Sequence, residues 1–312
     1  MKQPTVTIAV PVYNGAAYLR ESLDSILSQD FGDFEVIIGD NASSDGTEDI
    51  CRDFAARDPR IVYHRSPLNR GAAWNYNRLF GVAAGRYFKW ASHDDRIAPG
   101  YLTACVGELE RCPEAVIAFP HTVLIARDGQ PLGGHADDWD VRYGRAWQRF
   151  RHTINQHGLH NVVFGLMRAE AVRSTRLIGR FDGSDIVFLT EMALRGQFHQ
   201  VPGDLFQRRI HEGMSRRALK NPRDVAKWFD TSARAYHFTW TRLYAETVRA
   251  VVDAPLSPRE KALCLAITTR DWQWKRLGTE WLQTVQEITT PSAPDRYENF
   301  SEQVEHEHAA AL

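Results

Sequence analysis

The first two thirds of the chain alternate short apolar runs with longer segments in which apolar residues recur every three to four positions. The runs have the length of buried strands, and the longer segments have the period of helices, as in Leu19, Leu23 and Ile26. Strands are predicted over residues 5–12, 35–39, 60–64, 86–91, 115–125, 162–168 and 205–210. Helices are predicted from residue 19, from Ser44 or Asp45 through residue 54, over 71–83, from Pro99, and over 146–154 and 185–195.

Short loops between alternating strands and helices favour an α/β fold, in which a mostly parallel sheet has helices on both faces. The pattern changes after Arg217, where residues such as Trp228, Trp240 and Leu243 keep helical spacing without intervening strands. The domains expected from this change are an α/β domain over residues 1–215, a helical appendage over 216–290 and a flexible tail over 291–312.

The composition narrows the class of protein. The net charge of −1 gives no global field for nucleic acid or an anionic bilayer, so no nucleic-acid partner is expected. No run of eighteen apolar residues occurs and a predicted strand begins almost at once, so neither a transmembrane helix nor a signal peptide is expected. The four cysteines lack metal-binding spacing and indicate reduced thiols, which favours a cytoplasmic protein.

Acidic residues close three apolar runs: Asp40 closes the first, Asp94 and Asp95 the second, and Asp185 follows the third. Carboxylates at the ends of buried strands meet along one edge of a parallel sheet, where open α/β folds place their ligands. Acids in such a row suit a divalent cation that holds a phosphate, together with a general base. The pattern therefore indicates an enzyme that acts on a nucleotide-linked substrate.

The pair Asp94 and Asp95 has two interpretations. Adjacent carboxylates repel one another unless a cation or hydrogen-bond donors neutralise them. Mg²⁺ or Mn²⁺, bound by one or two carboxylates and the phosphates of a substrate, would do so. Alternatively, the two aspartates only cap the helix that Pro99 opens. Their position after a buried aromatic run favours the metal.

The other polar positions also have structural alternatives. Asp40 and Asn41 could bind a base or ribose, or could build the turn that their neighbours Asn-Ala-Ser-Ser-Asp-Gly favour. Asp185 could deprotonate an acceptor hydroxyl or could cap a helix. Arg209 and His211 could reach a phosphate or a metal, or could lie in a solvated loop.

Together and in this order, these segments resemble the family 2 glycosyltransferases of the GT-A fold, which is Rossmann-like. The stretches that carry the resemblance are 11–15 (PVYNG), 40–47 (DNASSDGT), 69–75 (NRGAAWN), 92–95 (SHDD), 184–185 (SD) and 209–211 (RIH). The resemblance covers about residues 4–215 and leaves out the helical segment that follows.

The resemblance implies a role for each matching residue. Asp94 would be the direct ligand of Mn²⁺ or Mg²⁺, with Asp95 beside it and His211 completing the metal or diphosphate site. Asp185 would be the catalytic base. The residues that would bind the nucleotide sugar are Pro11, Tyr13, Asn14, Asp40, Asn41, Arg70, Gly71, Asn75, Ser92, His93 and Asp94.

The reaction that the resemblance implies is inverting transfer of a sugar from a nucleoside-diphosphate sugar, with a UDP-sugar favoured. The acceptor would be a hydroxyl of a glycan, a lipid-linked or a small molecule, as in the synthesis of cell-envelope polysaccharides. Two positions depart from the family pattern. Ser92 replaces the first Asp of the metal-binding triplet, and Ser184 replaces the Glu that normally precedes the base.

Two other functions stay open. The departures at Ser92 and Ser184 motivate a nucleotide-sugar-binding partner protein that has lost catalysis. A nucleotidyltransferase could share a similar sheet, but the loop after the first predicted strand lacks the glycine-rich, basic sequence that such enzymes use for phosphates.

The helical segment is rich in tryptophan, with Trp228, Trp240, Trp272, Trp274 and Trp281. These side chains could pack against the α/β domain, form a homodimer interface or make peripheral contact with the inner face of a membrane that carries a lipid acceptor. Acceptor-binding residues are expected in residues 135–161, where His152, His157 and His160 gather, although structural roles for these histidines are equally open.

Overall fold

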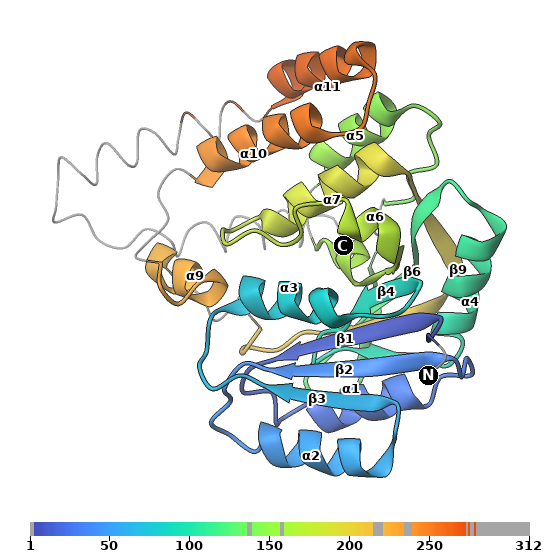
Figure 1. The fold of residues 1–312 in the computed structure, drawn as a ribbon, viewed down its shortest axis with the longest axis vertical. Helices are drawn as coiled ribbons and strands as arrows, with labels where there is room; N and C mark the ends of the chain where they lie inside the picture. Colours follow the sequence, from blue (N-terminus) through green and yellow to red (C-terminus); the bar gives the residue numbers. More distant parts are fainter. Residues whose placement is uncertain are drawn as a thin grey trace, which may run out of the picture.

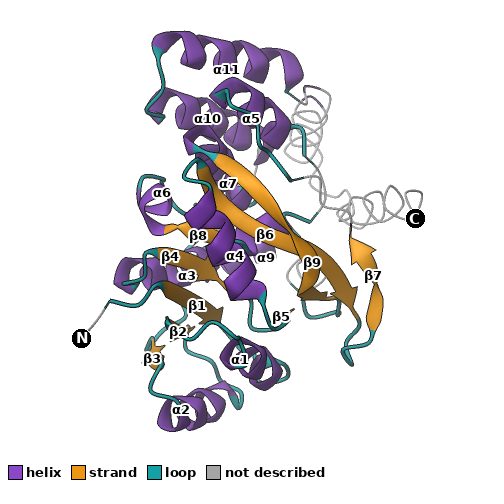
Figure 2. Ribbon diagram, turned by 90° about the vertical axis from the view of Figure 1, so that its right-hand side faces the viewer, coloured by secondary structure: helices purple, strands orange, loops and turns teal. Residues whose placement is uncertain are grey.

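The centre of the molecule is a nine-stranded sheet flanked by helices (Figures 1 and 2). The computed structural model describes residues 3–135, 139–156, 159–214, 221–233, 239–272, 274 and 278. The strands are β1 (Val6–Val12), β2 (Phe34–Asp40), β3 (Ile61–Arg65), β4 (Tyr87–Trp90), β5 (Arg96–Ile97), β6 (Ala115–Ile125), β7 (Pro131–His135), β8 (Leu166–Arg168) and β9 (Gln197–Arg209). Their order is β3-β2-β1-β4-β8-β6-β9-β5, with β7 paired to β6.

The predicted α/β class is confirmed, but the sheet is mixed. Strands β3, β2, β1 and β4 pair in parallel with one another, and β6 pairs in parallel with β9. The short strand β8 runs antiparallel to both β4 and β6, and β5 and β7 are antiparallel to β9 and β6. The parallel half brings the carboxyl ends of β1, β2 and β4 to one edge of the sheet, where the predicted site residues begin.

The helices cover both faces, as predicted. They are α1 (Leu19–Leu27), α2 (Thr47–Arg57), α3 (Ala72–Val82), α4 (Tyr101–Arg111), α5 (Ala146–Ile154), α6 (Ala169–Arg173), α7 (Ser184–Arg195), α9 (Pro222–Phe229), α10 (Thr239–Asp253) and α11 (Pro258–Asp271), with a 3-10 turn, η1, at Asn161–Phe164.

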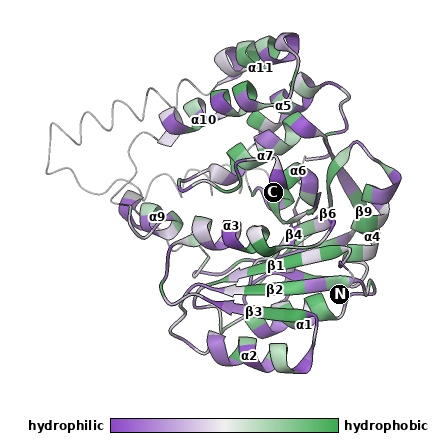
Figure 3. Cartoon of the chain, viewed as in Figure 1, coloured by the Kyte–Doolittle hydropathy of each residue, from purple (hydrophilic) through white to green (hydrophobic). Residues whose placement is uncertain are grey.

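Alternate residues of β1 and β2 supply the two sides of the core. Ile8 and Ile38 pack in the cluster that includes α1, α2 and α4, whereas Ala9 and Ile37 pack in the cluster that includes α3 and α7. Side chains of a strand point to opposite faces in turn, so a strand buried on both faces reads as a continuous apolar run. Figure 3 shows β1 and β2 as largely hydrophobic and the helices as two-coloured.

Two strand predictions differ from the structure. The predicted strand 162–168 is the turn η1 followed by the three-residue strand β8, because the amide of Gly165 bonds back to the carbonyl of Val162 at 2.9 Å and closes a turn there. Strand β9 begins at Gln197, well before the predicted residue 205. Its first residues include the buried but polar His199, which interrupts the apolar run by which a buried strand is predicted from sequence.

The C-terminal helices pack on the α/β part of the chain. Phe150 of α5 and Leu194 of α7 share a buried cluster with Val251 of α10 and Cys264 of α11. Trp240 and Trp272 pack against the cluster around Leu243, which agrees with the packing interpretation of these tryptophans.

Trp228 and Trp274 keep 37% and 46% of their surface exposed, and Trp281, His157 and residues 291–312 lie outside the described residues. The domain limits at 215 and 290 stay predictions. Among the described helices, none combines the length and hydropathy that a membrane span requires.

Candidate active site

Hydrogen bonds between the loops that follow β1 and β2 join them at the carboxyl edge of the sheet. The amide of Asn14 donates to Ser43 Oγ at 2.9 Å, and Asn14 Oδ1 accepts from the amide of Ser44 at 2.9 Å. The next amide, of Gly15, donates to Thr47 Oγ1 at the start of α2. Asn14 has a φ of 51°, a left-handed conformation that asparagine tolerates better than most residues. These bonds hold the first two predicted segments side by side.

The first loop combines buried and exposed predicted residues. Pro11 is buried within β1, whereas Tyr13 is 47% exposed and presents an aromatic surface at the edge of the site. A Cβ on Gly15 would lie 2.5 Å from Cδ2 of His93, so the absence of a side chain at Gly15 lets this loop approach the segment after β4.

Asp40 ends β2 and is completely buried. Its Oδ2 lies 2.6 Å from Nη1 of Arg65 and 2.9 Å from the hydroxyl of Tyr63, and its Oδ1 accepts from the amide of Ser43 at 2.8 Å. Burial, followed by the hydrogen bond to Asp40, raises the pKa of Tyr63, so its phenol remains a donor. Asp40 therefore organises the second loop through three neighbouring groups.

Asn41 and Asn75 hold the third predicted segment in place. Asn41 Nδ2 donates to Asn69 Oδ1 at 2.8 Å and Asn41 Oδ1 accepts from the amide of Arg70, while Asn75 Nδ2 donates to the carbonyl of Gly39 at 2.7 Å. Both asparagines are 2% exposed, so these contacts are structural.

The guanidinium of Arg70, by contrast, is exposed and lies 4.9 Å from the ring of Trp74. Gly71, just before α3, has a φ of 86° and leaves room for the carbonyl of Phe229, which would lie 2.4 Å from a Cβ. Arg70 is thus the member of this segment that offers a charged group at the surface.

Asp94 and His211 lie face to face, with Nε2 of His211 2.9 Å from Oδ2 of Asp94. Ser92 Oγ donates to the other oxygen, Oδ1. Burial raises the pKa of Asp94, but the hydrogen bond from His211, the charge of His93 and the hydrogen bond from Ser92 outweigh it and hold that pKa below the usual range. Asp94 is therefore a carboxylate whose two oxygens are oriented by separate donors.

Asp95 faces a different way from Asp94. Its side chain is 6% exposed, and Oδ1 accepts from the amide of Arg209 at 2.9 Å. Burial and the neighbouring charge of Asp94 raise its pKa. The buried guanidinium of Arg209 donates through Nε to the carbonyl of Asp94 at 2.9 Å and through Nη2 to Glu21. Arg209 thus fixes the backbone of the acidic pair from behind.

The donor set fits a divalent cation that shares its coordination with phosphates. Asp94 supplies a carboxylate oxygen and His211 an imidazole nitrogen, and Mn²⁺ accepts both ligand types. Asp95 faces β9 instead, so Asp94 and His211 are the two predicted metal ligands that lie together. Two protein ligands are enough for a cation whose remaining ligands are substrate phosphates and water.

Asp185 lies in the first turn of α7, after Gly183, whose φ of 77° starts the helix. Asp185 thus stands at the start of the helix predicted over residues 185–195, and unlike Asp40 it does not end a strand. Its side chain is 39% exposed, and Oδ2 lies 3.3 Å from Nδ1 of His160.

Tyr76 on α3 connects the acidic groups electrostatically. Burial raises the pKa of its phenol, and the charges of Asp94, Asp95 and Asp185 raise it further, whereas Arg208 lowers it. All three acidic positions therefore act on one phenol. Sequence reasoning did not identify Tyr76, because a tyrosine inside a helix carries no local signal of what it faces across the site. Arg208, which contacts Asn161 Oδ1, was missed for the same reason.

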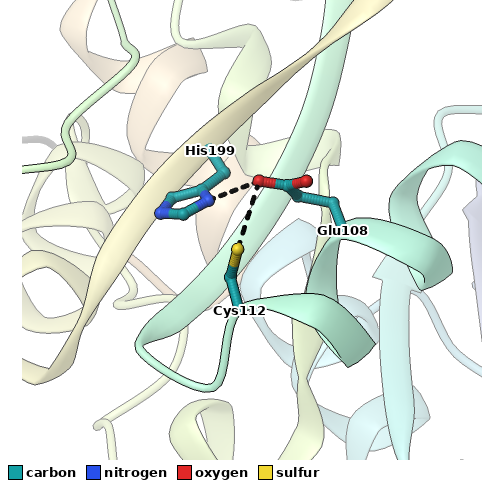
Figure 4. A group of neighbouring side chains, drawn as sticks. All are labelled: Glu108, Cys112 and His199. Carbon is teal, nitrogen blue, oxygen red and sulfur yellow. Dashed lines mark hydrogen bonds and ion pairs between the residues drawn. The ribbon is translucent and has the colours of Figure 1, made fainter.

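A second group of potential metal ligands lies where β9 begins, at the opposite edge of the sheet (Figure 4). His199 Nδ1 is 2.6 Å and Cys112 Sγ 3.7 Å from Oε1 of Glu108. The same carboxylate also contacts the guanidinium groups of Arg111 and Arg142. Two cationic groups already neutralise Glu108, so we interpret the cluster as an ion-pair network that joins α4 to β9.

Comparison with known proteins agrees with this architecture. Putative teichuronic acid biosynthesis glycosyltransferase TuaG of Bacillus subtilis (strain 168) is 35% identical over 132 residues, which cover 42% of this chain and 51% of TuaG. Matches to the first curated relatives cover 14% to 51% of their length, so the chain spans about half of those proteins or less.

Two solved structures share the fold. The structure of S. aureus TarS 1-349 in complex with UDP-GlcNAc has a TM-score of 0.62 and 15% identity, and the match covers 84% of this chain and 71% of that one. The mannosyltransferase PcManGT from Pyrobaculum calidifontis, solved with GDP-Man and Mn²⁺, has a TM-score of 0.56 and 18% identity, with 100% and 87% covered. Residues 7–178, more than half of the chain, match the family described as Glycosyl transferase family 2. The chain therefore belongs to glycosyl transferase family 2.

Proposed function

We propose that the protein transfers a sugar from a nucleoside-diphosphate sugar to an acceptor hydroxyl with inversion at the anomeric carbon. The observation that carries the proposal is the pairing of Asp94 with His211, whose Nε2 lies 2.9 Å from Oδ2 of Asp94, just after the end of β4. One acidic group faces an imidazole and can share a cation with it, and another is exposed and can accept a proton. The names of two neighbours, solved with UDP-GlcNAc and with GDP-Man and Mn²⁺, support a nucleotide-sugar donor.

The nucleoside would bind across the joined loops after β1 and β2. The exposed ring of Tyr13 can stack on a base, since aromatic and base rings attract one another face to face. The exposed guanidinium of Arg70 can pair with a phosphate oxygen. Asp40, Asn41 and Asn75 act mainly through the backbone that they hold, because their polar atoms are already engaged.

Asp94 and His211 are the residues that would hold Mn²⁺ or Mg²⁺, whose chemistry when bound is to neutralise the charge that develops on the leaving diphosphate. The hydrogen bond from Ser92 to Asp94 keeps the carboxylate ionised and oriented, so a serine at this position remains compatible with metal binding. Arg209 keeps the backbone of the pair in place while the charge changes.

Asp185 is the proposed general base. Its exposed carboxylate takes the proton of the acceptor hydroxyl as that oxygen bonds to the anomeric carbon. The bond between that carbon and the diphosphate oxygen breaks from the opposite face, and its electron pair leaves with the nucleoside diphosphate. The transition state has oxocarbenium character, and no covalent enzyme intermediate is needed.

Titration calorimetry with UDP, GDP and dTDP, each with and without Mn²⁺, tests donor binding first. Tight binding of one of them that requires Mn²⁺ is expected, with UDP favoured. Asp185→Asn should bind that nucleotide as the wild type does and lose sugar transfer. An Asp185→Asn variant that keeps most of its activity would refute the base assignment.

The alternatives predict different outcomes in the same experiments. A partner protein without catalysis would bind the nucleotide sugar and release no nucleoside diphosphate. A nucleotidyltransferase would release pyrophosphate from a nucleoside triphosphate. The name of TuaG points to teichuronic acid synthesis for that protein, and on this basis we extend to this chain the proposal of a cell-envelope glycan or lipid-linked acceptor. The cytoplasmic location, the homodimer and the peripheral membrane contact stay predictions.

A further inference from the structure

Tyr18, the residue just before α1, lies against the proposed metal ligand His211. The centroids of the two rings are 4.8 Å apart, and their planes are tilted by 54°. The guanidinium of Arg209 lies over the same tyrosine ring, with Cζ 4.7 Å from its centroid. Strand β9 ends at Arg209, so His211 follows directly after it. The ring of Tyr18 therefore contacts both polar side chains of the predicted stretch 209–211.

Tyr18 is fixed at its backbone and at its ring. Its amide donates to the carbonyl of Gly15 at 3.2 Å, and its carbonyl accepts from the amide of Ser22 at 3.0 Å. Arg209 is 2% exposed, and its Nη2 donates to Glu21, which lies on α1 itself. The contacts of Tyr18 with Arg209 and with the imidazole are made by the aromatic ring, so the ring is the part of this side chain that the site uses.

The hydrogen bond between His211 and Asp94 cannot orient the imidazole once both groups bind a cation. Nε2 of His211 lies 2.9 Å from Oδ2 of Asp94, and because a carboxylate only accepts, the nitrogen donates its proton. A metal ligand must present a bare nitrogen, so a shared cation replaces that proton. The contact between the rings of His211 and Tyr18 does not use this proton and remains available to hold the plane of the imidazole.

We propose that Tyr18 is a positioning residue for the metal site: its ring holds the imidazole of His211 so that Nε2 keeps facing the cation shared with Asp94. The inference rests on the proposed function, in which Asp94 and His211 bind Mn²⁺ or Mg²⁺. Groups that orient a metal-bound histidine typically contribute about 10–100-fold in metal affinity. The alternative is that Tyr18 only packs α1 against the end of β9, which would change stability and leave the metal ligands as they are.

The first test observes the ligands of bound Mn²⁺ without any reaction. Electron spin echo envelope modulation of the protein with UDP and Mn²⁺ detects a nitrogen bonded to the ion, and its loss in His211→Gln assigns it to His211. The wild type and Tyr18→Phe should both show the coupling, because phenylalanine keeps the ring. In Tyr18→Leu the coupling should be lost. A folded Tyr18→Leu variant that keeps it would overturn the proposal.

The second test measures affinity by titration calorimetry of UDP at a fixed concentration of Mn²⁺. The apparent Kd should rise about tenfold in Tyr18→Leu and stay within twofold in Tyr18→Phe, whereas without Mn²⁺ all three proteins should bind UDP alike. Tyr244→Leu is the control, because Tyr244 is also partly buried and contacts two rings, those of Trp272 and Trp274, on the C-terminal helices. Equal affinities in Tyr18→Leu and Tyr244→Leu, or a loss in Tyr18→Leu that does not depend on Mn²⁺, would refute the positioning role.

The outcomes separate the inference from the function on which it rests. A wild type without nitrogen coupling would mean that His211 is not a ligand, so the proposed metal site fails and the inference with it. Coupling that survives Tyr18→Leu refutes the inference alone. If Tyr18→Leu does not fold, the wild type still decides: nuclear Overhauser contacts between the ring protons of Tyr18 and His211 are expected in the metal-free protein and with UDP and Mg²⁺. Their absence from either state would overturn the proposal.

Discussion

Gly71 offers the sharpest test of how the chain builds the third segment of the site. Its φ of 86° and ψ of 164° fall in a region that only glycine enters readily, at a cost of about 1–3 kcal/mol for other residues. A Cβ would also lie 2.4 Å from the carbonyl oxygen of Phe229 and 2.8 Å from Cα of Asp230, both backbone atoms that cannot rotate away. Such overpacking costs about 1–3 kcal/mol more.

Gly71→Ala also lowers the conformational entropy of the unfolded chain. This effect stabilises the folded state by about 0.4–1 kcal/mol and offsets part of the loss. The expected net loss in the free energy of unfolding is therefore about 3 kcal/mol. Gly81 is the matched control, because it lies near the end of the same helix, α3, and a Cβ there meets nothing within 4 Å. Gly81→Ala should stabilise the protein by about 0.5–1 kcal/mol, since alanine favours the helix.

Urea denaturation followed by circular dichroism measures both variants against the wild type. If the urea midpoint of Gly71→Ala equals that of the wild type or of Gly81→Ala, the contact between the start of α3 and the end of α9 does not exist as described. Gly71 was predicted to bind the nucleotide sugar, and this experiment separates that role from its backbone role. A loss of UDP affinity in folded Gly71→Ala without a loss of stability would favour direct binding.

Three further changes test other parts of the argument. Asp94→Ala should abolish the Mn²⁺ dependence of UDP binding in calorimetry; equal affinity with and without Mn²⁺ in both proteins would exclude the metal role. Hydrogen bonds from Arg270 and Arg151, against a smaller effect of burial, lower the pKa of Asp271 to about 2. The carboxylate therefore stabilises the fold above its unfolded pKa of about 4, and the small advantage over Asp271→Asn, under about 1 kcal/mol, should vanish as the pH falls toward 2. Phe150→Ala should cost about 3–5 kcal/mol in a single unfolding transition, because Phe150 is fully buried between α5 and the C-terminal helices; separate transitions would mean that those helices fold independently.

The sequence predicts most of the parallel half of the sheet because its strands are apolar on both faces and end in turn-forming or acidic residues. Asp40 and the pair Asp94 and Asp95 could be found in this way. The turn η1 could not, since an uninterrupted apolar stretch has no period that separates a 3-10 turn from a strand. Gly165 ends the turn, and a Cβ there would lie 2.7 Å from Cγ2 of Ile117, a tertiary contact that the local sequence does not reveal.

Contacts between distant segments explain what else the sequence left out. His160 and Asp185 are 25 positions apart and lie on different elements, so nothing in either neighbourhood indicates that they meet. The direction of Asp95 was equally hidden, because it depends on the amide of Arg209, which β9 brings to it. Local pattern thus predicts which residues reach the edge of the sheet, and tertiary pairing decides what each of them faces there.

Ser184 directly precedes the proposed base and can be tested for a role in supporting it. The resemblance noted from the sequence would place it where the family has a Glu. Ser184 is 1% exposed, and its hydroxyl has no hydrogen-bond partner among the described residues. A buried hydroxyl without a partner stabilises nothing, so Ser184→Ala should leave the free energy of unfolding unchanged or slightly higher and the release of nucleoside diphosphate within twofold of the wild type. A large loss in Ser184→Ala would mean that the serine hydroxyl contacts the acceptor or the base during the reaction, and that support for Asp185 comes from the preceding residue after all.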